Sequence, residues 1–236
     1  MEKAKNYTHL VPVGFSSDKL IASLKQFPVH KILILTHQCD ENNQKVQSTV
    51  KDIREAFKGF EIQDRIVDRE NVLDSSLQML GIIEEEVRGR NTVKINISGG
   101  LRNIGISAYI VSLVSDVPIY TDIPDSTDDE VYHLKGILDI PLFPIKELPK
   151  EQISILEELE DGVKSVDVLI SKLKPGLEKG TADFGNERSR LSHHIKKLKN
   201  WGFIVTEKRS KNLIIQKSKF GEIFLKGREI KILMEH

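Results

Sequence analysis

Short apolar segments alternate with amphipathic ones through the first 145 residues. Runs such as LVPV and KILILT have the length of strands, and the segments between them repeat apolar residues at helical spacing. Apolar strands separated by helices are typical of a parallel sheet that helices cover on both faces. The pattern predicts strands at residues 7–13, 31–36, 60–67, 92–97 and 117–121, and helices at residues 16–26, 43–57, 72–88 and 101–114.

The chain changes character near residue 145. An acidic turn at residues 125–130 leads into a predicted hairpin, which begins with Val131–Leu134 and ends near Phe143. Three prolines between residues 141 and 149 then mark a boundary. We therefore predict a Rossmann-like α/β domain at residues 1–145, with a parallel sheet, and a second domain at residues 146–236.

The second domain is predicted to contain three helices and then a β-hairpin. The helices are expected at residues 149–159, 166–173 and 186–201, and the β-prone segments are residues 203–207 and 213–216. A closing helix begins near residue 220. This order of elements is that of a winged helix-turn-helix, which binds DNA.

The longest predicted helix of this domain is apolar on one side and basic on the other. Leu191, Ile195 and Leu198 anchor it in a core, and Gly202 ends it. Arg and Ser side chains near the start of such a helix can reach base edges, and cations at a hairpin tip suit phosphate contact. The predicted DNA-binding residues are Arg188, Ser189, Arg190, Ser192, His193, Lys196 and Lys197 on the helix, and Lys208, Arg209 and Lys211 on the hairpin.

Composition adds a charge asymmetry and several exclusions. The formal net charge of the 236 residues is zero, yet residues 188–236 carry 13 Lys and Arg against 4 Asp and Glu. Such a basic segment indicates a local contact with a polyanion. A single cysteine, Cys39, excludes an internal disulfide and offers no metal cluster. Because neither a membrane-spanning run nor a signal peptide is evident, we expect a cytoplasmic protein. The sequence offers no evidence for a metal or redox cofactor, and we expect none.

Two loops of the first domain follow strands that should end at the same sheet edge, where open α/β sheets bind ligands. The first is PVGFSSD at residues 12–18, and the second is NISGGLRN at residues 96–103. Gly99 and Gly100 permit close backbone approach, and the amides of the following helix together with Arg102 attract an anion. The alternative is that the glycines only make a tight turn. NAD is not expected, because Gly14 is the lone glycine where the dinucleotide fingerprint needs three.

The order of elements, the segments VPVGFSSDKL and NISGGLRN, and the fused winged helix resemble archaeal CARF–winged-helix proteins, which include CRISPR-associated transcriptional regulators. The resemblance covers nearly the whole chain. It implies a homodimer that binds a cyclic oligoadenylate, most often cyclic tetra-adenylate, between two copies of these loops. The candidate ligand-binding residues are Gly14, Phe15, Ser16, Asn96, Ser98, Gly99, Gly100, Leu101, Arg102 and Asn103, of which Asn96 could equally fix the loop.

The sequence therefore predicts a ligand-responsive transcriptional regulator that binds double-stranded DNA and acts on CRISPR-associated genes in antiviral defence. A related hypothesis is a nucleotide-sensing regulator outside CRISPR. Two enzymatic alternatives remain, a nuclease and a ring nuclease. Arg188 and His193 have the R-x4-H spacing of HEPN ribonucleases, and His37 is a candidate base for cutting a cyclic ligand. We expect no catalytic residue, because a domain with a β-hairpin does not suit an all-helical nuclease and a surface histidine explains His37.

Overall fold

The chain forms two compact units. The computed structural model describes residues 6–125, 132–142, 147–209 and 212–235. The first unit comprises residues 1–144 and 227–236, and the second comprises residues 145–226. The expected second domain ran to residue 236, whereas the residues from Gly227 onward pack with the first unit.

A six-stranded sheet forms the centre of the first unit. Its strands are β1 (Asn6–Pro12), β2 (Lys31–Thr36), β3 (Glu61–Ile66), β4 (Asn91–Asn96), β5 (Ile119–Pro124) and β6 (Leu134–Asp139). The spatial order is β3-β2-β1-β4-β5-β6; the first five strands run parallel, and β6 is antiparallel to β5. The chain crosses outward from β1 in one direction and from β4 in the other, so the switch point lies between these two strands.

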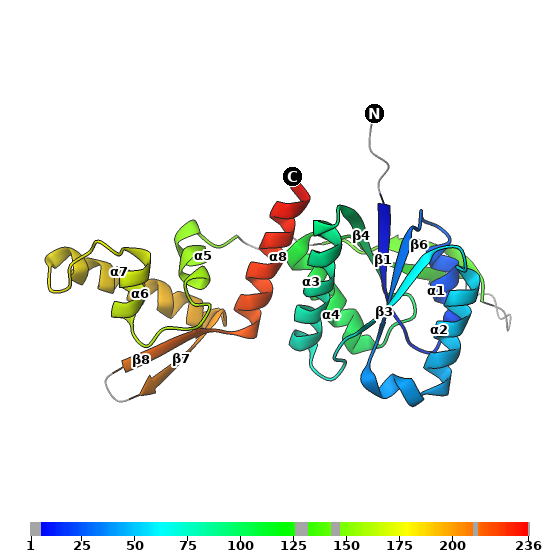
Figure 1. Ribbon diagram of the computed structural model, residues 1–236, viewed down its shortest axis with the longest axis horizontal. Helices are drawn as coiled ribbons and strands as arrows, with labels where there is room; N and C mark the ends of the chain where they lie inside the picture. The colour runs from blue at the N-terminus through cyan, green and yellow to red at the C-terminus, as the bar shows by residue number, and fades with distance from the viewer. Residues whose placement is uncertain (1–5, 126–131, 143–146, 210–211, 236) are drawn as a thin grey trace. The chain divides into compact units, whose positions relative to one another are not determined.

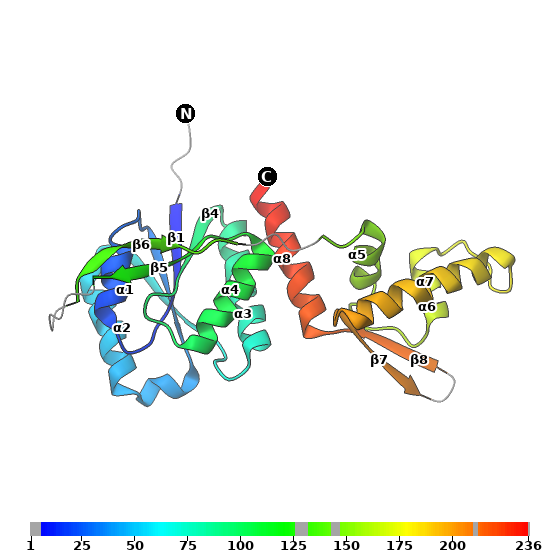
Figure 2. The same cartoon turned by 180° about the vertical axis from the view of Figure 1, so that it is seen from behind.

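Helices cover both faces of this sheet (Figures 1 and 2). On one face lie α1 (Ser17–Leu24) and α2 (Gln44–Ala56), and on the other lie α3 (Val72–Arg88) and α4 (Arg102–Ser115). The α1 side is closed by a cluster in which Leu20 and Ile53 pack with Val11 and Ile34. The predicted α/β fold with a mostly parallel sheet is therefore confirmed.

The helices of the first unit begin where the sequence supplies a capping side chain. The side-chain Oδ1 atom of Asn43 accepts hydrogen bonds from the backbone amides of Lys45 and Val46 at the start of α2. Asn71 caps α3 in the same way. An uncapped first turn leaves backbone donors unpaired, so these residues fix the starts of the helices. The short 3-10 helix η1 (Gln38–Asn42), between β2 and α2, was not expected.

The end of the sheet differs from the sequence prediction. A separate hairpin was expected from Val131 to near Phe143, and both of these residues lie outside the described part of the chain. Instead, β5 continues to Pro124 and is itself the partner of β6, with Thr121 opposite Leu138. The fifth strand is therefore paired with the next strand along the chain, and the expected independent hairpin is not formed.

Three helices and a two-stranded antiparallel sheet form the second unit. They are α5 (Lys150–Glu157), α6 (Val166–Leu173), α7 (Ala182–Asn200), β7 (Ile204–Arg209) and β8 (Asn212–Lys217). Leu156, Leu169, Leu191 and Ile215 meet in one core from four of these elements. The α7 helix begins four residues earlier than its predicted start at residue 186, because the Thr181 hydroxyl accepts the Phe184 amide and caps it.

The closing helix, α8 (Lys219–Glu235), contributes residues to both units. Within the first unit, a Cβ on Gly227 would lie 2.6 Å from the Val114 side chain, so glycine permits a close approach to α4. Lys231 also forms a 2.9 Å ion pair with Asp116. Across the described residues, none of the helices has the length and apolar character that a membrane crossing requires.

Candidate functional site

The two glycine-containing loops meet at the switch point of the sheet. The Gly14 loop (residues 13–16) follows β1, and the Gly99 loop (residues 97–101) follows β4, the parallel neighbour of β1. A Cβ on Gly14 would overlap the carbonyl oxygen of Gly99. A Cβ on Gly99 would lie 2.6 Å from the Leu20 side chain, and one on Gly100 would lie 3.0 Å from Pro12. These three glycines therefore allow the loops to pack against each other and against α1.

Asn96 and Ser98 hold the Gly99 loop in place. The fully buried Asn96 donates from its side-chain amide to the Ser23 hydroxyl over 2.8 Å, and its carbonyl accepts the Ser98 amide at 2.9 Å. The Ser98 hydroxyl in turn accepts the backbone amide of Asp122 at 2.9 Å. Both side chains, predicted as candidate ligand contacts, thus join β4 to α1 and β5.

Other residues of the two loops remain open to solvent. Phe15 is 57% exposed, so its ring is accessible from solvent. Ser16 and Arg102 are also exposed, and Arg102 has no ion pair within the described residues. Leu101 occupies the N-cap position of α4 without a side-chain hydrogen bond to the helix. The first turn of α4 therefore presents its amides beside a free guanidinium group.

A polar network ties this edge to β2 and β3. The buried carboxylate of Asp40, in η1, forms a 2.5 Å ion pair with Arg69, which follows β3. The Asn103 side chain donates to the carbonyl oxygen of Arg69 and so fixes the start of α4. Asp40 also accepts the His37 amide at 2.9 Å. Asp40 and Arg69, which the sequence prediction missed, thus link the loops after β2 and β3 and, through Asn103, the start of α4.

His37 serves this network as a cap. Its Nδ1 atom accepts the Cys39 amide at 3.2 Å, and together with the Asp40 side chain it closes the start of η1. The crevice beside it, lined in part by Arg69 and Leu101, has a volume of only about 10 Å³, which is room for about one water molecule. A cleft of about 610 Å³ lies elsewhere, between α1 and the β6 end of the sheet.

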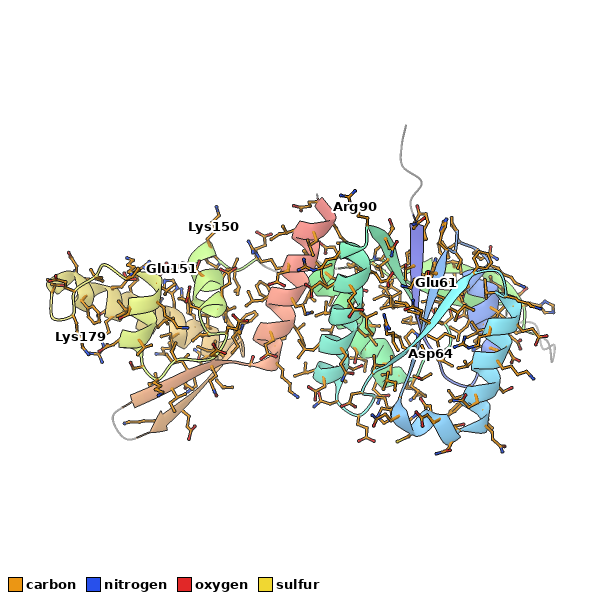
Figure 3. The ribbon with its side chains drawn as sticks, in the orientation of Figure 1. Glu61, Asp64, Arg90, Lys150, Glu151 and Lys179 are labelled. Atoms are coloured by element: carbon orange, nitrogen blue, oxygen red, sulfur yellow. The ribbon has the colours of Figure 1, made fainter. Side chains whose placement is uncertain are left out.

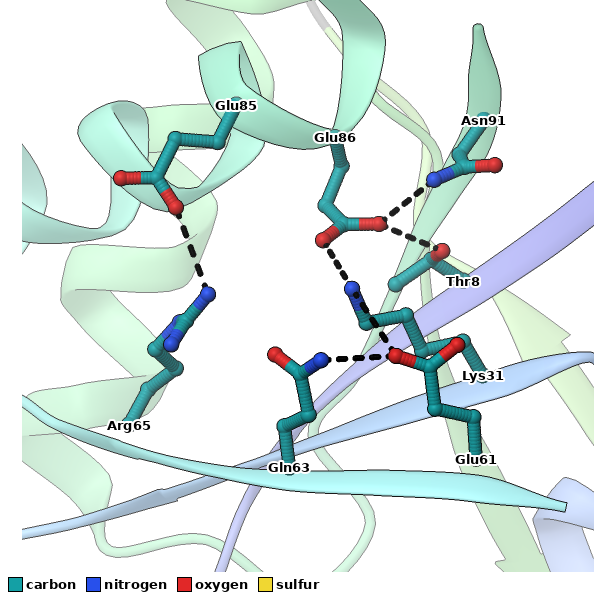
Figure 4. A network of polar contacts seen from close by, with 8 residues as sticks. All are labelled: Thr8, Lys31, Glu61, Gln63, Arg65, Glu85, Glu86 and Asn91. Carbon is teal, nitrogen blue, oxygen red and sulfur yellow. Dashed lines mark hydrogen bonds and ion pairs between the residues drawn. The ribbon is translucent and has the colours of Figure 1, made fainter. Parts of the chain in front are cut away.

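A second polar network lies at the opposite, amino-terminal edge of the sheet (Figure 4). Glu86 of α3 forms a 2.6 Å ion pair with Lys31 and accepts hydrogen bonds from Thr8 and Asn91. Burial opposes ionisation of Glu86, but these partners outweigh it and hold the pKa of Glu86 below its ordinary value. Lys31 also lies 3.6 Å from Glu61. This network joins the starts of four strands to α3, and we assign it to stability.

The predicted DNA-binding residues lie on α7 and the hairpin of the second unit. Ser189, Ser192, His193, Lys196 and Lys197 are exposed on α7, and Lys208 is exposed on β7. The Ser189 and Ser192 hydroxyls donate to the backbone carbonyls four residues earlier. The side chain of Arg209 and the whole of Lys211 lie outside the described residues.

The two arginines of α7 are engaged within the second unit. Arg190 forms ion pairs of 2.7 Å with Glu187 and 2.5 Å with Glu151 of α5, which is labelled in Figure 3. These contacts raise the pKa of Arg190, chiefly through Glu187. Arg188 lies 3.2 Å from Asp167 of α6, and Lys179 lies 3.0 Å from the same carboxylate. Arg188 and Arg190 therefore flank the outward face of α7 and are tied to the neighbouring helices.

Metal binding finds no support in the described part of the chain. Nowhere in it do three His, Cys, Asp or Glu side chains gather as a metal site. The exposed Cys39 is a free thiol. Arg188 and His193, the pair with ribonuclease spacing, are both exposed, and Arg188 is held by Asp167.

Comparison with known proteins gives one full-length relative. An uncharacterized protein of Archaeoglobus fulgidus is 26% identical over 225 residues, which are 93% of this chain and 97% of that protein.

Several solved structures also align, at low similarity. Can2 from Sulfobacillus thermosulfidooxidans, in complex with cyclic tetra-adenylate, aligns at 14% identity with a TM-score of 0.41 over 96% of this chain and 64% of its own. Enterococcus italicus Csm6, bound to cyclic hexa-2'-fluoro-hexa-dAMP, aligns at 12% identity with a TM-score of 0.43 over 85% of this chain and 57% of its own. This chain therefore spans less than two thirds of either protein.

The family assignment comes from the first unit. The profile of the family described as "HFX_2341_N:-like, N-terminal" matches residues 7–127, from β1 through the glycine loops to the end of β5. The match includes just over half of the chain. This protein therefore belongs to the HFX_2341_N:-like, N-terminal family.

Proposed function

We propose that this protein is a homodimeric transcriptional regulator whose affinity for DNA is controlled by a cyclic oligoadenylate. The observation that carries the proposal is the meeting of the Gly14 and Gly99 loops at the switch point, beside the exposed Arg102. Ligands of open α/β sheets bind at this position. The second unit of the same chain adds a helix with an exposed basic face.

The chemistry of the loops favours a nucleotide. The uncapped first turn of α4 and the free guanidinium group of Arg102 suit a phosphodiester. The exposed ring of Phe15 suits stacking with a base. The resemblance to CARF proteins narrows this nucleotide to a cyclic oligoadenylate, with cyclic tetra-adenylate as the first candidate and CRISPR-associated genes as the target of regulation.

Dimerisation would complete the ligand site. The crevice at the carboxyl edge has a volume of about 10 Å³ in one chain, far too small for a ring of four nucleotides. Two copies of the exposed loops facing each other across a two-fold axis would enclose a larger space. A two-fold dimer would also present two DNA-binding units, which predicts a palindromic or repeated DNA site.

The second unit supports DNA binding through its element order and charge. Three helices followed by an antiparallel hairpin are the elements of a winged helix. His193, Lys196 and Lys197 are exposed on the helix, and Lys208 is exposed on the hairpin. Lysines that neutralise phosphates release counterions, so we expect affinity to fall steeply with salt. For the ligand to act as a signal, it must bind two states of the dimer with different affinity.

Calorimetry with cyclic tetra-adenylate tests the ligand. We expect the wild-type protein to bind, Arg102→Ala to lose at least about tenfold in affinity, and Arg90→Ala to bind normally. Arg90 is a matched control because it is also exposed but lies between α3 and β4, at the other end of the sheet (Figure 3). Absence of binding to the wild type would remove the proposed signal. Equal binding by all three proteins would remove the proposed site.

A further inference from the structure

One stripe of polar side chains on α7 faces away from the core of the second unit. The buried residues of this helix include Glu187, Leu191 and Ile195. Opposite them, exposed residues recur at intervals of three or four positions. They are Asn186, Ser189, His193, Lys196 and Asn200, which we call the outward stripe. Within the described part of the chain, no residue of the outward stripe forms an ion pair, and the Asn186 side chain has no hydrogen bond.

The arginines, by contrast, already have acidic partners. Arg190 is bound by Glu187 and Glu151, and Glu187 is additionally bound by Lys174 at 2.9 Å. A guanidinium group must present two donors to read guanine. To do so, Arg190 would have to break its ion pairs with two carboxylates, and the buried Glu187 would lose a partner. Arg190 therefore fits a positioning role, in which it fixes α7 against α5.

We propose that Asn186 is the main base-reading residue of this protein and recognises an A·T base pair in the major groove. The inference rests on the proposed DNA-binding function. An asparagine amide can donate to N7 and accept from N6 of adenine in a bidentate contact. Asn186 lies in the N-terminal half of α7, the part of a recognition helix that reaches base edges. Lys196 and Lys197, further along, contact phosphates.

The other asparagine of the outward stripe provides the contrast. Asn200 is the last residue of α7 and is exposed like Asn186. Asn200 is fourteen positions after Asn186, a rise of about 21 Å along the helix. Only a few side chains of a straight recognition helix can contact base edges. Asn186 and Asn200 therefore form a matched pair, in which the same substitution has different expected effects.

The test uses the full-length protein. Duplexes with a randomised segment are selected with the wild type, with and without cyclic tetra-adenylate, to find the preferred site. Affinities for that site and for an unrelated duplex are then measured at several salt concentrations for Asn186→Ala, Asn200→Ala and Lys196→Ala. Thermal unfolding confirms that each variant is folded, which we expect because all three side chains are exposed.

For Asn186→Ala we expect about ten- to hundredfold weaker binding to the selected site, with the preference for one A·T pair lost and the salt dependence unchanged. Asn200→Ala should match the wild type. Lys196→Ala should weaken binding to both duplexes and lower the salt slope by about one. The inference is wrong if Asn186→Ala keeps the base preference of the wild type. It is also wrong if the substitution reduces the preference for none of the A·T pairs in the selected site. In both cases the proposed DNA binding stands. If the wild type binds neither duplex, the proposed function fails with it.

Discussion

Gly14 and Gly99 lie so close together that a Cβ on Gly14 would overlap the carbonyl oxygen of Gly99. Their backbones approach where β1 and β4 end side by side, although the two loops are far apart in sequence. The glycines are therefore needed for packing between the loops, whether or not a ligand also approaches them.

Gly14→Ala should destabilise the first unit by about 1–3 kcal/mol, because the added methyl group forces the two loops apart. Calorimetry should show a melting temperature lower by several degrees. Gly105→Ala is the matched control, since a Cβ at Gly105, within α4, meets no atom within 4 Å. Alanine favours helix, so Gly105→Ala should leave stability unchanged or raise it by up to about 1 kcal/mol. Equal melting temperatures for both variants would contradict the loop contact.

Glu86→Gln should cost about 3 kcal/mol of unfolding free energy, because it leaves the amino group of Lys31 without its buried counter-charge. Asp64→Asn makes the same change of a carboxylate to an amide, but in the exposed pair with Arg54. That change should cost less than about 1 kcal/mol. Denaturant titration of the three proteins measures the difference. A loss no larger for Glu86→Gln than for Asp64→Asn would show that the network of Figure 4 does not stabilise the sheet.

Stability should fall as the pH is lowered from about 6.5 toward 4, because of His9. This side chain is fully buried between Tyr120 and the Pro28 carbonyl, and burial lowers its pKa to about 4. The unfolded chain, with a pKa near 6.5, takes up the proton more readily, so acid favours unfolding in this window. The shift corresponds to roughly 3 kcal/mol in total.

The pKa of Glu86 is also lowered, so this residue adds to the loss of stability in acid mainly below pH 4.5, its ordinary pKa. The range from pH 6.5 to 4.5 therefore separates the effect of His9 from that of Glu86. Denaturant unfolding across it should show a slope in the wild type that is reduced in His9→Gln, which cannot titrate. An unchanged slope in that variant would assign the acid sensitivity to other groups.

Arg190→Gln should lower the free energy of opening of α7 by about 1–2 kcal/mol, because the buried Glu187 loses a charged hydrogen-bond partner. Hydrogen exchange on the full chain should show faster exchange of the α5 and α7 amides, with the first unit unchanged. Ser189→Ala, one residue earlier and exposed, should leave exchange near the wild-type rate. Protection equal to the wild type in Arg190→Gln would mean that this arginine is free for another role.

Local pattern alone was enough to predict most of the elements. The segment KILILT is β2 with the same bounds, and the predicted helix at residues 72–88 is α3. Both have strong periodicity and clear ends, and such signals depend only on near neighbours. The sequence also located the two glycine loops, because they follow apolar strands. It did not foresee β6 as the partner of β5, since pairing depends on contacts that periodicity does not encode.

Only the tertiary structure decided which polar residues are already engaged. Thr8 and Glu86 are 78 positions apart and meet because β1 lies beside β4 and α3 packs across them. In the same way, the sequence predicts that Arg190 is available to bind DNA, whereas the packing of α5 against α7 pairs it with Glu151. Composition and spacing show that a side chain is polar or charged. Long-range packing decides whether a charged group is paired within the protein or available to a ligand, and no local pattern specifies that packing.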